Sequence, residues 1–320
     1  MKTIGVLTSG GDAPGMNAAI RAVVRTACEN GIRVYGINRG YQGLIDDDLR
    51  ELNIRSVSDI IHRGGTMLYS ARCLAFKEEE GMQKAIQTCK KYGIEGIVVI
   101  GGDGSFRGAR DLSLRGIPCI GVPGTIDNDI VSSDYTIGYD TCLNTIQDMV
   151  DRLRDTVESH SRCMVIEVMG NRCGDLTLNA GIAVGATAIV IPEIDCDIEK
   201  HVIERIKRTQ KTSKKHFIIM VAEGIGGVAE LAEKIQKECN VETRSIVLGH
   251  VQRGGSPSVR DRVLASQMGY EAVQLLMNNI GNRVVAMKND KIVNYDIYEA
   301  LTMKKEVDTT LYKLAHEISI

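Results

Sequence analysis

The stretch from residue 94 to residue 129, IEGIVVIGGDGSFRGARDLSLRGIPCIGVPGTIDND, constrains the fold more than any other part of the chain. Its first apolar run, residues 94–100, is rich in β-branched side chains and ends at the glycine-rich loop GGDGS. A helical pattern over residues 106–114 follows, and a second apolar run, residues 117–122, ends at the acidic loop PGTIDND. This order predicts two buried parallel strands joined by a helix. Both loops would then lie at the carboxyl edge of one sheet, where open α/β folds bind ligands.

The two loops suggest phosphate chemistry. Glycines let the backbone turn tightly and approach a ligand, and successive N–H groups at the start of a helix form an anion nest. Asp103 would repel phosphate in that nest unless a cation lay between them, so we expect Asp103 to be a Mg²⁺ ligand. Either Asp127 or Asp129 would serve as the base for a hydroxyl that attacks phosphorus. The alternative is that GGDG is an ordinary turn and that both aspartates are surface polar residues.

Strands and helices alternate through the rest of the chain, and the alternation occurs twice, over residues 2–122 and 163–248. It predicts an α/β protein with two doubly wound, mainly parallel three-layer αβα lobes and an active site in the cleft between them. The expected strands are residues 2–8, 34–37, 94–100, 117–122, 163–168, 188–191, 217–222 and 245–248. The expected helices are residues 13–30, 78–92, 106–114, 140–158, 176–185, 197–211, 228–238 and 260–277, with a hairpin near residues 288–290 and two short helical pieces at the end.

Composition and charge exclude several other classes of protein. The chain has 320 residues, of which 25% are charged, with a net charge of −2 and no block of Lys or Arg. This balance argues against a general nucleic-acid-binding protein, and no apolar run reaches the roughly 18 residues of a membrane span. The start, MKTIGVLTSGG, does not resemble a signal peptide, and nine cysteines without metal-binding spacing fit a reducing cytoplasm. The loop after the first strand lacks GxGxxG, which disfavours a nicotinamide-dependent dehydrogenase.

Six motifs together resemble the signature loops of the bacterial ATP-dependent 6-phosphofructokinases, the phosphofructokinase A family. They are LTSGGDAPGMNAAIR at residues 7–21, HRGGT at 62–66, GGDGS at 101–105, PGTIDND at 123–129, MVIEVMG at 164–170 and GHVQRGGSP at 249–257. The resemblance runs from near residue 3 to the last helix. It implies Mg²⁺-dependent phosphorylation of D-fructose 6-phosphate at the 1-hydroxyl by ATP, in glycolysis, by a cytoplasmic homotetramer. The implied ATP-binding lobe comprises residues 1–138 plus about 252–304, and the sugar-phosphate-binding lobe residues 139–251 plus about 305–320.

The resemblance also implies roles for individual residues. The aspartate matching Asp127 takes the proton from the sugar hydroxyl, a choice that the residues alone leave open, and the supporting catalytic residues are Thr125, Asp129 and Arg72. The implied contacts of ATP and Mg²⁺ are Gly11, Arg72, Cys73, Gly102, Asp103, Gly104 and Ser105. The implied contacts of fructose 6-phosphate are Thr125, Ile126, Asp127, Arg162, Met169, Gly170, Asn171, Arg172, Glu223, Arg244, His250 and Arg253. Arg162 and Arg244 would reach the sugar phosphate from a neighbouring subunit.

Two glycines bear on the phosphoryl donor. ATP-dependent members of the family have glycine at the positions of Gly104 and Gly124, whereas pyrophosphate-dependent relatives carry Asp and Lys there. Glycine leaves room for a nucleotide, so the resemblance implies ATP. Taken without the resemblance, Arg72 would also fit a surface arginine and His250 a buried core histidine.

The chain departs from the family pattern in two places. Asn171 stands where the family usually has arginine, and we expect Arg172, one residue later, to substitute through a reshaped loop. The implied effector site for ADP or phosphoenolpyruvate, between subunits, consists of Arg21, Arg25, Arg154, Gly185, Thr187, Lys214 and Lys215. Thr187 replaces an acidic residue and Thr212 a basic one, which predicts weak or altered activation by ADP. From their spacing alone, Arg21 and Arg25 would fit a solvated basic helix face.

Two other functions stay open at this point. One is a pyrophosphate-dependent or other-sugar kinase of the same fold. The other, suggested by Asn171, is a catalytically weakened nucleotide-sensing regulatory protein.

Overall fold

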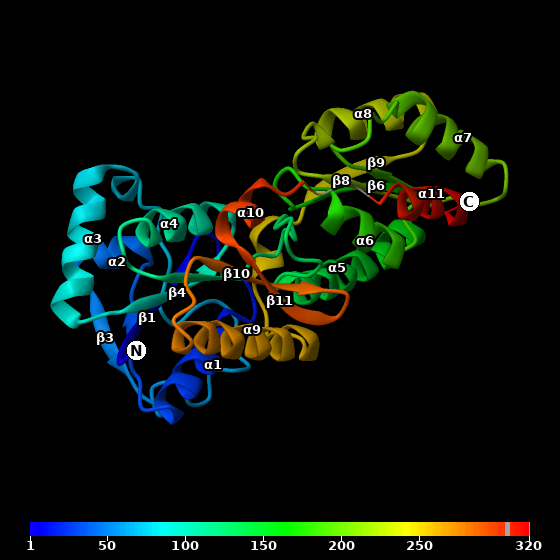
Figure 1. The fold of residues 1–320 in the computed structure, drawn as a ribbon. Helices are drawn as coiled ribbons and strands as arrows, with labels where there is room; N and C mark the ends of the chain where they lie inside the picture. Colours follow the sequence, from blue (N-terminus) through cyan, green and yellow to red (C-terminus); the bar gives the residue numbers. More distant parts are fainter. Residues whose placement is uncertain (305–307, 320) are drawn as a thin grey trace. The chain divides into compact units, whose positions relative to one another are not determined.

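The computed structural model describes residues 1–304 and 308–319, which form two compact units (Figure 1). Unit 1 comprises residues 1–126, 130–141 and 253–304, and unit 2 comprises residues 127–129, 142–252 and the described residues after 304. Each unit is therefore assembled from segments far apart in the sequence. Residues 305–307 and 320, which the sequence analysis assigned to the second lobe, lie outside the described part. The expected lobe boundaries and the cleft between the lobes stay predictions.

Unit 1 is built on a seven-stranded sheet with the order β11-β10-β5-β4-β1-β2-β3. The inner strands run parallel, whereas β3 and β11 are antiparallel to β2 and β10 respectively. The strands are β1 (Thr3–Ser9), β2 (Arg33–Ile37), β3 (Leu49–Leu52), β4 (Gly96–Gly101), β5 (Cys119–Pro123), β10 (Arg283–Lys288) and β11 (Lys291–Asp296). Strands β1, β4 and β5 are buried along their whole length, as their continuous apolar sequences predict.

Helices cover the sheet of unit 1 on both sides. They are α1 (Met16–Glu29), α2 (Tyr41–Asp46), α3 (Glu79–Tyr92), α4 (Asp103–Ser113), α9 (Val259–Met277), α10 (Ile297–Thr302) and the 3₁₀ turn η1 (Ala75–Lys77). One core cluster joins α2, α3, α4 and α10 to the sheet. Helices α1 and α9 pack against each other, and a Cβ atom at Gly269 would lie only 2.8 Å from the carbonyl oxygen of Ala19. Glycine at 269 therefore permits this close helix packing.

Unit 2 is built on a four-stranded parallel sheet with the order β7-β8-β6-β9. Its strands are β6 (Cys163–Val168), β7 (Ala188–Val190), β8 (Phe217–Ala222) and β9 (Thr243–Val247). Its helices are α6 (Asp175–Ala183), α7 (Glu204–Gln210), α8 (Val228–Cys239), α11 (Thr309–Ile318), the π-helical turn η2 (Glu199–Ile203) and the 3₁₀ turn η3 (Gly249–Arg253), while α5 (Tyr139–Ser159) begins in unit 1 and continues in unit 2. A second core cluster fills the space between this sheet and η2, α7 and α8.

Several expected elements differ from the observed ones. Helix α4 begins at Asp103, three residues before the expected start, so the GGDGS loop itself opens the helix. Helix α1 begins only at Met16, because Gly15 has a left-handed φ of 108°. The expected single helix over residues 197–211 is interrupted: a π-helical turn precedes α7. Within the described residues, no helix has the length and apolar character that crossing a membrane requires.

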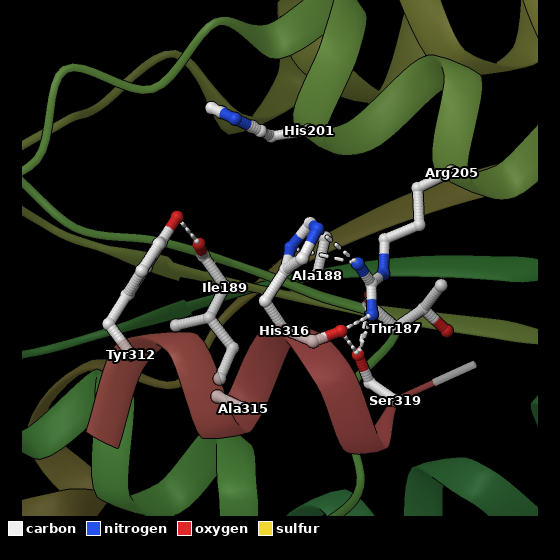
Figure 2. A pocket seen from close by; sticks show the side chains of 9 residues that line it. All are labelled: Thr187, Ala188, Ile189, His201, Arg205, Tyr312, Ala315, His316 and Ser319. Carbon is white, nitrogen blue, oxygen red and sulfur yellow. Dashed lines mark hydrogen bonds between the residues drawn. The ribbon is translucent and has the colours of Figure 1, made fainter. Parts of the chain in front are cut away.

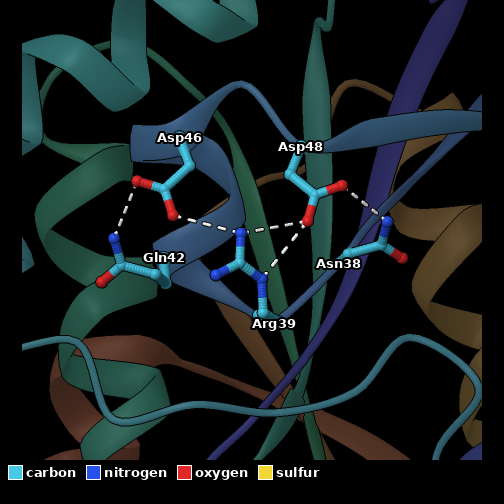
Figure 3. Close-up of polar contacts among 5 residues, drawn as sticks. All are labelled: Asn38, Arg39, Gln42, Asp46 and Asp48. Atoms are coloured by element: carbon cyan, nitrogen blue, oxygen red, sulfur yellow. Dashed lines mark hydrogen bonds and ion pairs between the residues drawn. The ribbon is translucent and has the colours of Figure 1, made fainter.

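The segment between β2 and β3 was not predicted at all, and a polar network holds it (Figure 3). The guanidinium of Arg39 donates to Asp46 at 3.1 Å and to Asp48 at 3.1 Å. The amide of Asn38 donates to the other Asp48 oxygen at 2.8 Å, and this hydrogen bond is the main reason why the pKa of Asp48 is lowered. Such a network leaves no apolar periodicity in the sequence, so pattern analysis passes over α2 and β3.

Candidate active site

Three strands of unit 1 end side by side. Ser9 of β1 is in register with Gly101 of β4, which is in register with Pro123 of β5. The loops that follow are tied together, because Ser105 Oγ donates to the Ser9 carbonyl at 3.1 Å and the N–H of Gly124 donates to the Gly101 carbonyl at 3.0 Å. The structure therefore brings together the three loops that contain Gly11, residues 102–105 and Gly124.

The start of helix α4 leaves open space beside Asp103. Cβ atoms built on Gly102 or Gly104 meet no heavy atom within 4 Å. Gly101 is different, because a Cβ atom there would lie 2.3 Å from the Ser9 carbonyl oxygen, so glycine is required for the strands to end this close together. Backbone N–H groups at a helix start, next to open space, are suited to phosphate.

Asp103 is the only carboxylate in the GGDGS loop, and it has a local partner. Its Oδ2 accepts hydrogen bonds from Arg107 Nε at 3.0 Å and from Arg107 Nη2 at 2.9 Å. Both side chains are about half exposed, at 47% and 54%, so the pair is worth only about 0.3–0.5 kcal/mol and a stronger ligand would displace it. No cluster of three or more His, Cys, Asp or Glu suited to a metal occurs in the part of the chain that the structure describes. A single carboxylate beside open space fits Mg²⁺, which takes most of its ligands from phosphate and water.

Arg253 lies against the first of these loops. A Cβ atom at Gly11 would lie 3.3 Å from the Cζ and the Nη2 of Arg253. Arg253, expected among the contacts of fructose 6-phosphate, belongs to unit 1. A side chain at position 11 would therefore press against the guanidinium of Arg253, which would have to shift by a few tenths of an ångström.

The HRGGT motif is held in place by α1 and by the chain after Arg253. Asn17 Nδ2 donates to the carbonyls of Arg63 at 3.2 Å and Gly64 at 3.1 Å. A Cβ atom at Gly64 would lie 2.3 Å from the Gly255 carbonyl oxygen, and Ser256 Oγ donates to the His62 carbonyl at 2.8 Å. Segments of three motifs, of which the first and the last are more than two hundred residues apart, thus form one packed region in unit 1.

The next segment approaches the same strand end and carries Arg72 and Cys73. Thr8 Oγ1 donates to the Tyr69 carbonyl at 2.8 Å, and Ser70 Oγ donates to the Gly10 carbonyl. Arg72 itself is exposed. Cys73 packs against the core cluster of unit 1, and burial raises the pKa of its thiol, so this cysteine is a neutral packing residue in the described structure.

The acidic loop is divided between the units. Thr125 belongs to unit 1, where its N–H donates to the Ile137 carbonyl at 3.1 Å and its carbonyl accepts from Thr136 Oγ1 at 2.7 Å. Asp127 and Asp129 are partly buried and belong to unit 2. Asn128 between them is buried, has a left-handed φ of 52° and donates through Nδ2 to Asp175 at 2.6 Å. Ile126, the last residue of this segment in unit 1, is buried as well.

A buried aspartate that the sequence analysis missed supports this loop. Asp261 is fully buried near the start of α9 and accepts from the N–H of Gly138 at 2.9 Å and the N–H of Thr141 at 2.8 Å. Burial raises the pKa of Asp261, although these hydrogen bonds act in the opposite direction. Because Ile137 pairs with Thr125, Asp261 fixes the strand segment that supports the acidic loop. An acidic residue within the first turn of a helix is too common a signal to have revealed this role.

In unit 2 the MVIEVMG motif and Glu223 meet at one edge. Strands β6 and β8 end in register at Val168 and Ala222. Glu223, directly after β8, accepts through Oε1 from the N–H groups of Gly170, at 3.1 Å, and Asn171. Met169 donates its N–H to Gln252 Oε1 at 3.1 Å. The carboxylate of Glu223 therefore holds Gly170 and Asn171, and the side-chain amide of Gln252 holds Met169.

Asn171 has the backbone shape that its residue type favours. Its φ is 55°, in the left-handed region that asparagine adopts more readily than arginine. Arg172 follows it and is exposed. His250, in η3, is also exposed, so the alternative of a buried core histidine is wrong.

Arg162 and Arg244 lie away from the loop of residues 169–171 of the same chain. Both pair with Glu242: Arg162 Nε lies 3.0 Å from Oε2 and Arg244 Nη2 lies 2.7 Å from Oε1. Arg162 precedes β6 and Arg244 lies near the start of β9, so both are at the amino edge of the sheet. Strand β6 separates them from residues 169–171 by roughly 17 Å.

The expected effector residues fall into two groups. Arg21 and Arg25 lie on α1 in unit 1, and the pKa of Arg21 is lowered by burial and by the charge of Arg25. Unit 2 holds the others, namely Arg154, Gly185, Thr187, Lys214 and Lys215. Arg154 donates to the Val184 carbonyl, and burial, then Arg154, lowers the pKa of Lys214.

Comparisons with known proteins agree on one family. The family model described as "Phosphofructokinase" matches residues 3–276. The chain is 56% identical to an "ATP-dependent 6-phosphofructokinase" of Clostridioides difficile and 57% identical to one of Bacillus subtilis, each over 320 residues and the full length of both chains. The solved phosphofructokinase of Saccharomyces cerevisiae is similar with a TM-score of 0.90 and 33% identity over 100% of this chain, which spans about half (48%) of that longer chain. A pyrophosphate-dependent phosphofructokinase of Marinobacter aquaeolei, at 23% identity, has a TM-score of 0.86 over 97% of this chain and 86% of its own, and shares the fold.

Proposed function

The chain belongs to the phosphofructokinase family, and on that premise we propose that it transfers a phosphoryl group from ATP to the 1-hydroxyl of fructose 6-phosphate. The products are fructose 1,6-bisphosphate and ADP, as glycolysis requires. One observation supports this proposal. Three adjacent strands of unit 1 end in loops, and these loops leave open space beside Asp103 at the start of α4. The chain is thus a kinase that uses ATP and Mg²⁺.

On the nucleotide side, we assign the phosphates to the loops at Gly11 and residues 102–105, with Arg72 and Cys73 completing the contacts. Asp103 would hold Mg²⁺, which offsets phosphate charge when bound. Arg107 would leave Asp103 at that point, because an exposed pair is weak. The open space at Gly104 supports ATP as the donor, since a larger side chain there would occupy that space.

On the sugar side, we assign Asp127 as the base that accepts the proton of the 1-hydroxyl, with Thr125 and Asp129 supporting it. Ile126, residues 169–172, Glu223, His250 and Arg253 would contact the sugar phosphate. Asp261 supports the site as a positioning residue, because it fixes the segment that pairs with Thr125. Positioning of this kind lowers the entropic cost of aligning the two reactants.

We further propose a cytoplasmic homotetramer in which Arg162 and Arg244 serve the site of a neighbouring subunit. Their place at the opposite edge of the sheet from residues 169–171 supports this assignment. The effector residues would bind ADP or phosphoenolpyruvate, with weak activation by ADP because Thr187 carries no charge.

A coupled assay with ATP, Mg²⁺ and fructose 6-phosphate tests the reaction, with pyrophosphate offered in a parallel assay. We expect turnover with ATP as the donor and none with pyrophosphate. Asp127→Asn should lower kcat by at least about 10²-fold, as is typical of a missing general base. Asp148→Asn is the matched control, because Asp148 is an exposed carboxylate on α5 that pairs with Arg152. Turnover with pyrophosphate instead of ATP, or a fully active Asp127→Asn, would contradict the proposal.

A further inference from the structure

One hydrogen bond joins the acidic loop to the start of helix α6. Asn128, which lies between Asp127 and Asp129, donates through Nδ2 to Asp175 Oδ2 at 2.6 Å. All four residues belong to unit 2. A hydrogen bond to an ionised carboxylate is short and stronger than one between neutral groups. The contact therefore ties the middle of the loop to α6.

The backbone of Asn128 makes this tie important for its two neighbours. Asn128 is only 2% exposed and has a φ of 52°, in the left-handed region. Asparagine and aspartate enter this region more readily than most residues other than glycine. A single left-handed residue turns the chain sharply, so the directions of Asp127 and Asp129 depend on it. A fixed side chain at Asn128 helps to keep the turn in place.

The position of Asp175 is itself fixed by the residue before it. The N–H of Gly174 donates to Glu193 Oε1 at 2.6 Å. A Cβ atom at Gly174 would lie 2.4 Å from the Cβ of Ile191, so only glycine fits between α6 and the chain after β7. The Gly174 carbonyl accepts from the N–H of Leu178 at 2.8 Å and so opens the helix. Asp175 is therefore presented by a closely packed helix start.

The same segment continues the loop of residues 169–172, which we assign to the sugar phosphate. The N–H of Cys173 donates to the Gly170 carbonyl at 2.9 Å and closes a turn directly before Gly174. Asp175 thus lies at the end of the sugar loop and contacts the acidic loop.

We propose that Asp175 is a positioning residue for phosphoryl transfer. Its carboxylate holds Asn128 and thereby sets Asp127 relative to the sugar loop. This role rests on the proposed function, in which Asp127 is the base and residues 169–172 contact the sugar phosphate. It differs from the role of Asp261, which belongs to unit 1 and binds the backbone after the acidic loop.

A reciprocal exchange of the two side chains tests the proposal. Asn128→Asp keeps the size of the side chain and its tolerance of the left-handed backbone, but sets two carboxylates against each other. We expect kcat with ATP and fructose 6-phosphate to fall by about 10–10²-fold, because misplacing a catalytic group by 1 Å can cost that much. The KM for ATP should stay nearly unchanged, because the nucleotide loops belong to unit 1. Adding Asp175→Asn lets carboxylate and amide exchange places, and kcat should return to within about threefold of the wild-type value.

Two control variants separate this role from general effects. Asn179→Asp is the same substitution on α6, but Asn179 Nδ2 donates to the backbone carbonyl of Asp175, at 2.9 Å, so kcat should stay at the wild-type value. Tyr312→Phe removes a hydrogen bond elsewhere in unit 2, where the hydroxyl donates to the Ile189 carbonyl at 3.3 Å beside a small cavity (Figure 2). It should lower the Tm and leave kcat unchanged.

An unchanged kcat in Asn128→Asp would overturn the proposal, as would an equal loss in Asn179→Asp or a loss that the exchange does not recover. If Asn128→Asp does not fold, Asp175→Ala decides the question: kcat should fall by about tenfold, and a full catalytic rate would overturn the proposal. Failure of the proposed function has a different signature, because the wild-type protein would then lack turnover with ATP or Asp127→Asn would be fully active.

Discussion

At the scale of single residues, the site depends on its glycines, which have no side chain, as much as on its charged residues. Gly102 and Gly104 flank Asp103, and neither would meet a heavy atom within 4 Å if it carried a Cβ atom. Gly101 and Gly11 are confined, by the Ser9 carbonyl and by Arg253 respectively. The four glycines therefore have two different roles. Gly102 and Gly104 keep space open beside Asp103, whereas Gly101 and Gly11 allow neighbouring groups to lie close to the backbone.

Adding a carboxylate at Gly104 should weaken ATP binding without harming the fold. We expect Gly104→Asp to raise the KM for ATP by about tenfold or more, since like charges a few ångströms apart cost on the order of 1–4 kcal/mol. The Tm should stay nearly constant, because the added atoms enter open space. Steady-state kinetics and a thermal melt measure the two effects, with Gly104→Ala as the uncharged control. An unchanged KM for ATP would show that the nucleotide does not pass this glycine.

Arg172 is expected to supply the charge that Asn171 lacks. Asn171 has a left-handed backbone, and Arg172 next to it is exposed. Removing a preorganised cation from developing charge costs about 3 kcal/mol, so Arg172→Ala should lower kcat by roughly 10²-fold. Arg152→Ala, an exposed arginine on α5, is the control for general loss of charge. If Arg172→Ala keeps the full catalytic rate, Arg172 does not take the role of the arginine that the family usually has at the position of Asn171.

At the scale of elements, α9 and the start of α5 are joined through one buried carboxylate. Asp261 accepts from Gly138 and from both the N–H and the hydroxyl of Thr141. Its raised pKa shows that burying the charge is costly, so part of the hydrogen-bond energy offsets that cost. Through Asp261, helix α9 is therefore hydrogen-bonded to the segment that follows the acidic loop.

Asp261→Ala should destabilise the protein by about 2–4 kcal/mol, because two backbone N–H groups lose a buried acceptor. We also expect kcat to fall more than the KM for ATP rises, since the segment that pairs with Thr125 loosens. Urea denaturation gives the free energy of unfolding. The control is Asp296→Ala, which removes the partly buried N-cap of α10 at an expected cost of about 1 kcal/mol. A stability loss no larger than that of the control would mean that Asp261 does not anchor the loop.

Elements with continuous apolar sequence were the ones that could be predicted. Strands β6 and β8 begin and end at the expected residues, because β8 is buried along its whole length and β6 is buried at every residue except Glu167. Helix α2 and strand β3 were missed, because Arg39 and two aspartates hold them through polar contacts that leave no period. The motif positions followed from the resemblance, but Asp261 and the division of the acidic loop depend on contacts between segments far apart in the chain.

At the scale of the whole molecule, the two arginines paired with Glu242 predict shared sites. Arg162→Ser and Asp127→Ser should each be nearly inactive alone. Mixing them under conditions that let subunits exchange should restore part of the activity, because some sites would then combine an intact Asp127 with an intact Arg162 from a neighbour. Initial rates before and after mixing measure this, and mixing Asp127→Ser with Asp129→Ser is the control that should not recover. Failure to recover in both mixtures, despite demonstrated exchange, would place Arg162 and Asp127 in the same subunit's site or outside it.

Glu242 holds Arg162 and Arg244 at the same time, and this has a consequence for how activity depends on assembly. A solitary subunit pairs both guanidinium groups with one carboxylate of its own, Glu242. To bind the sugar phosphate of a neighbouring subunit, each guanidinium must leave Glu242. The same two arginines would then take part both in catalysis and in the association of subunits. Specific activity should therefore decline on dilution and recover when substrate is present during dilution.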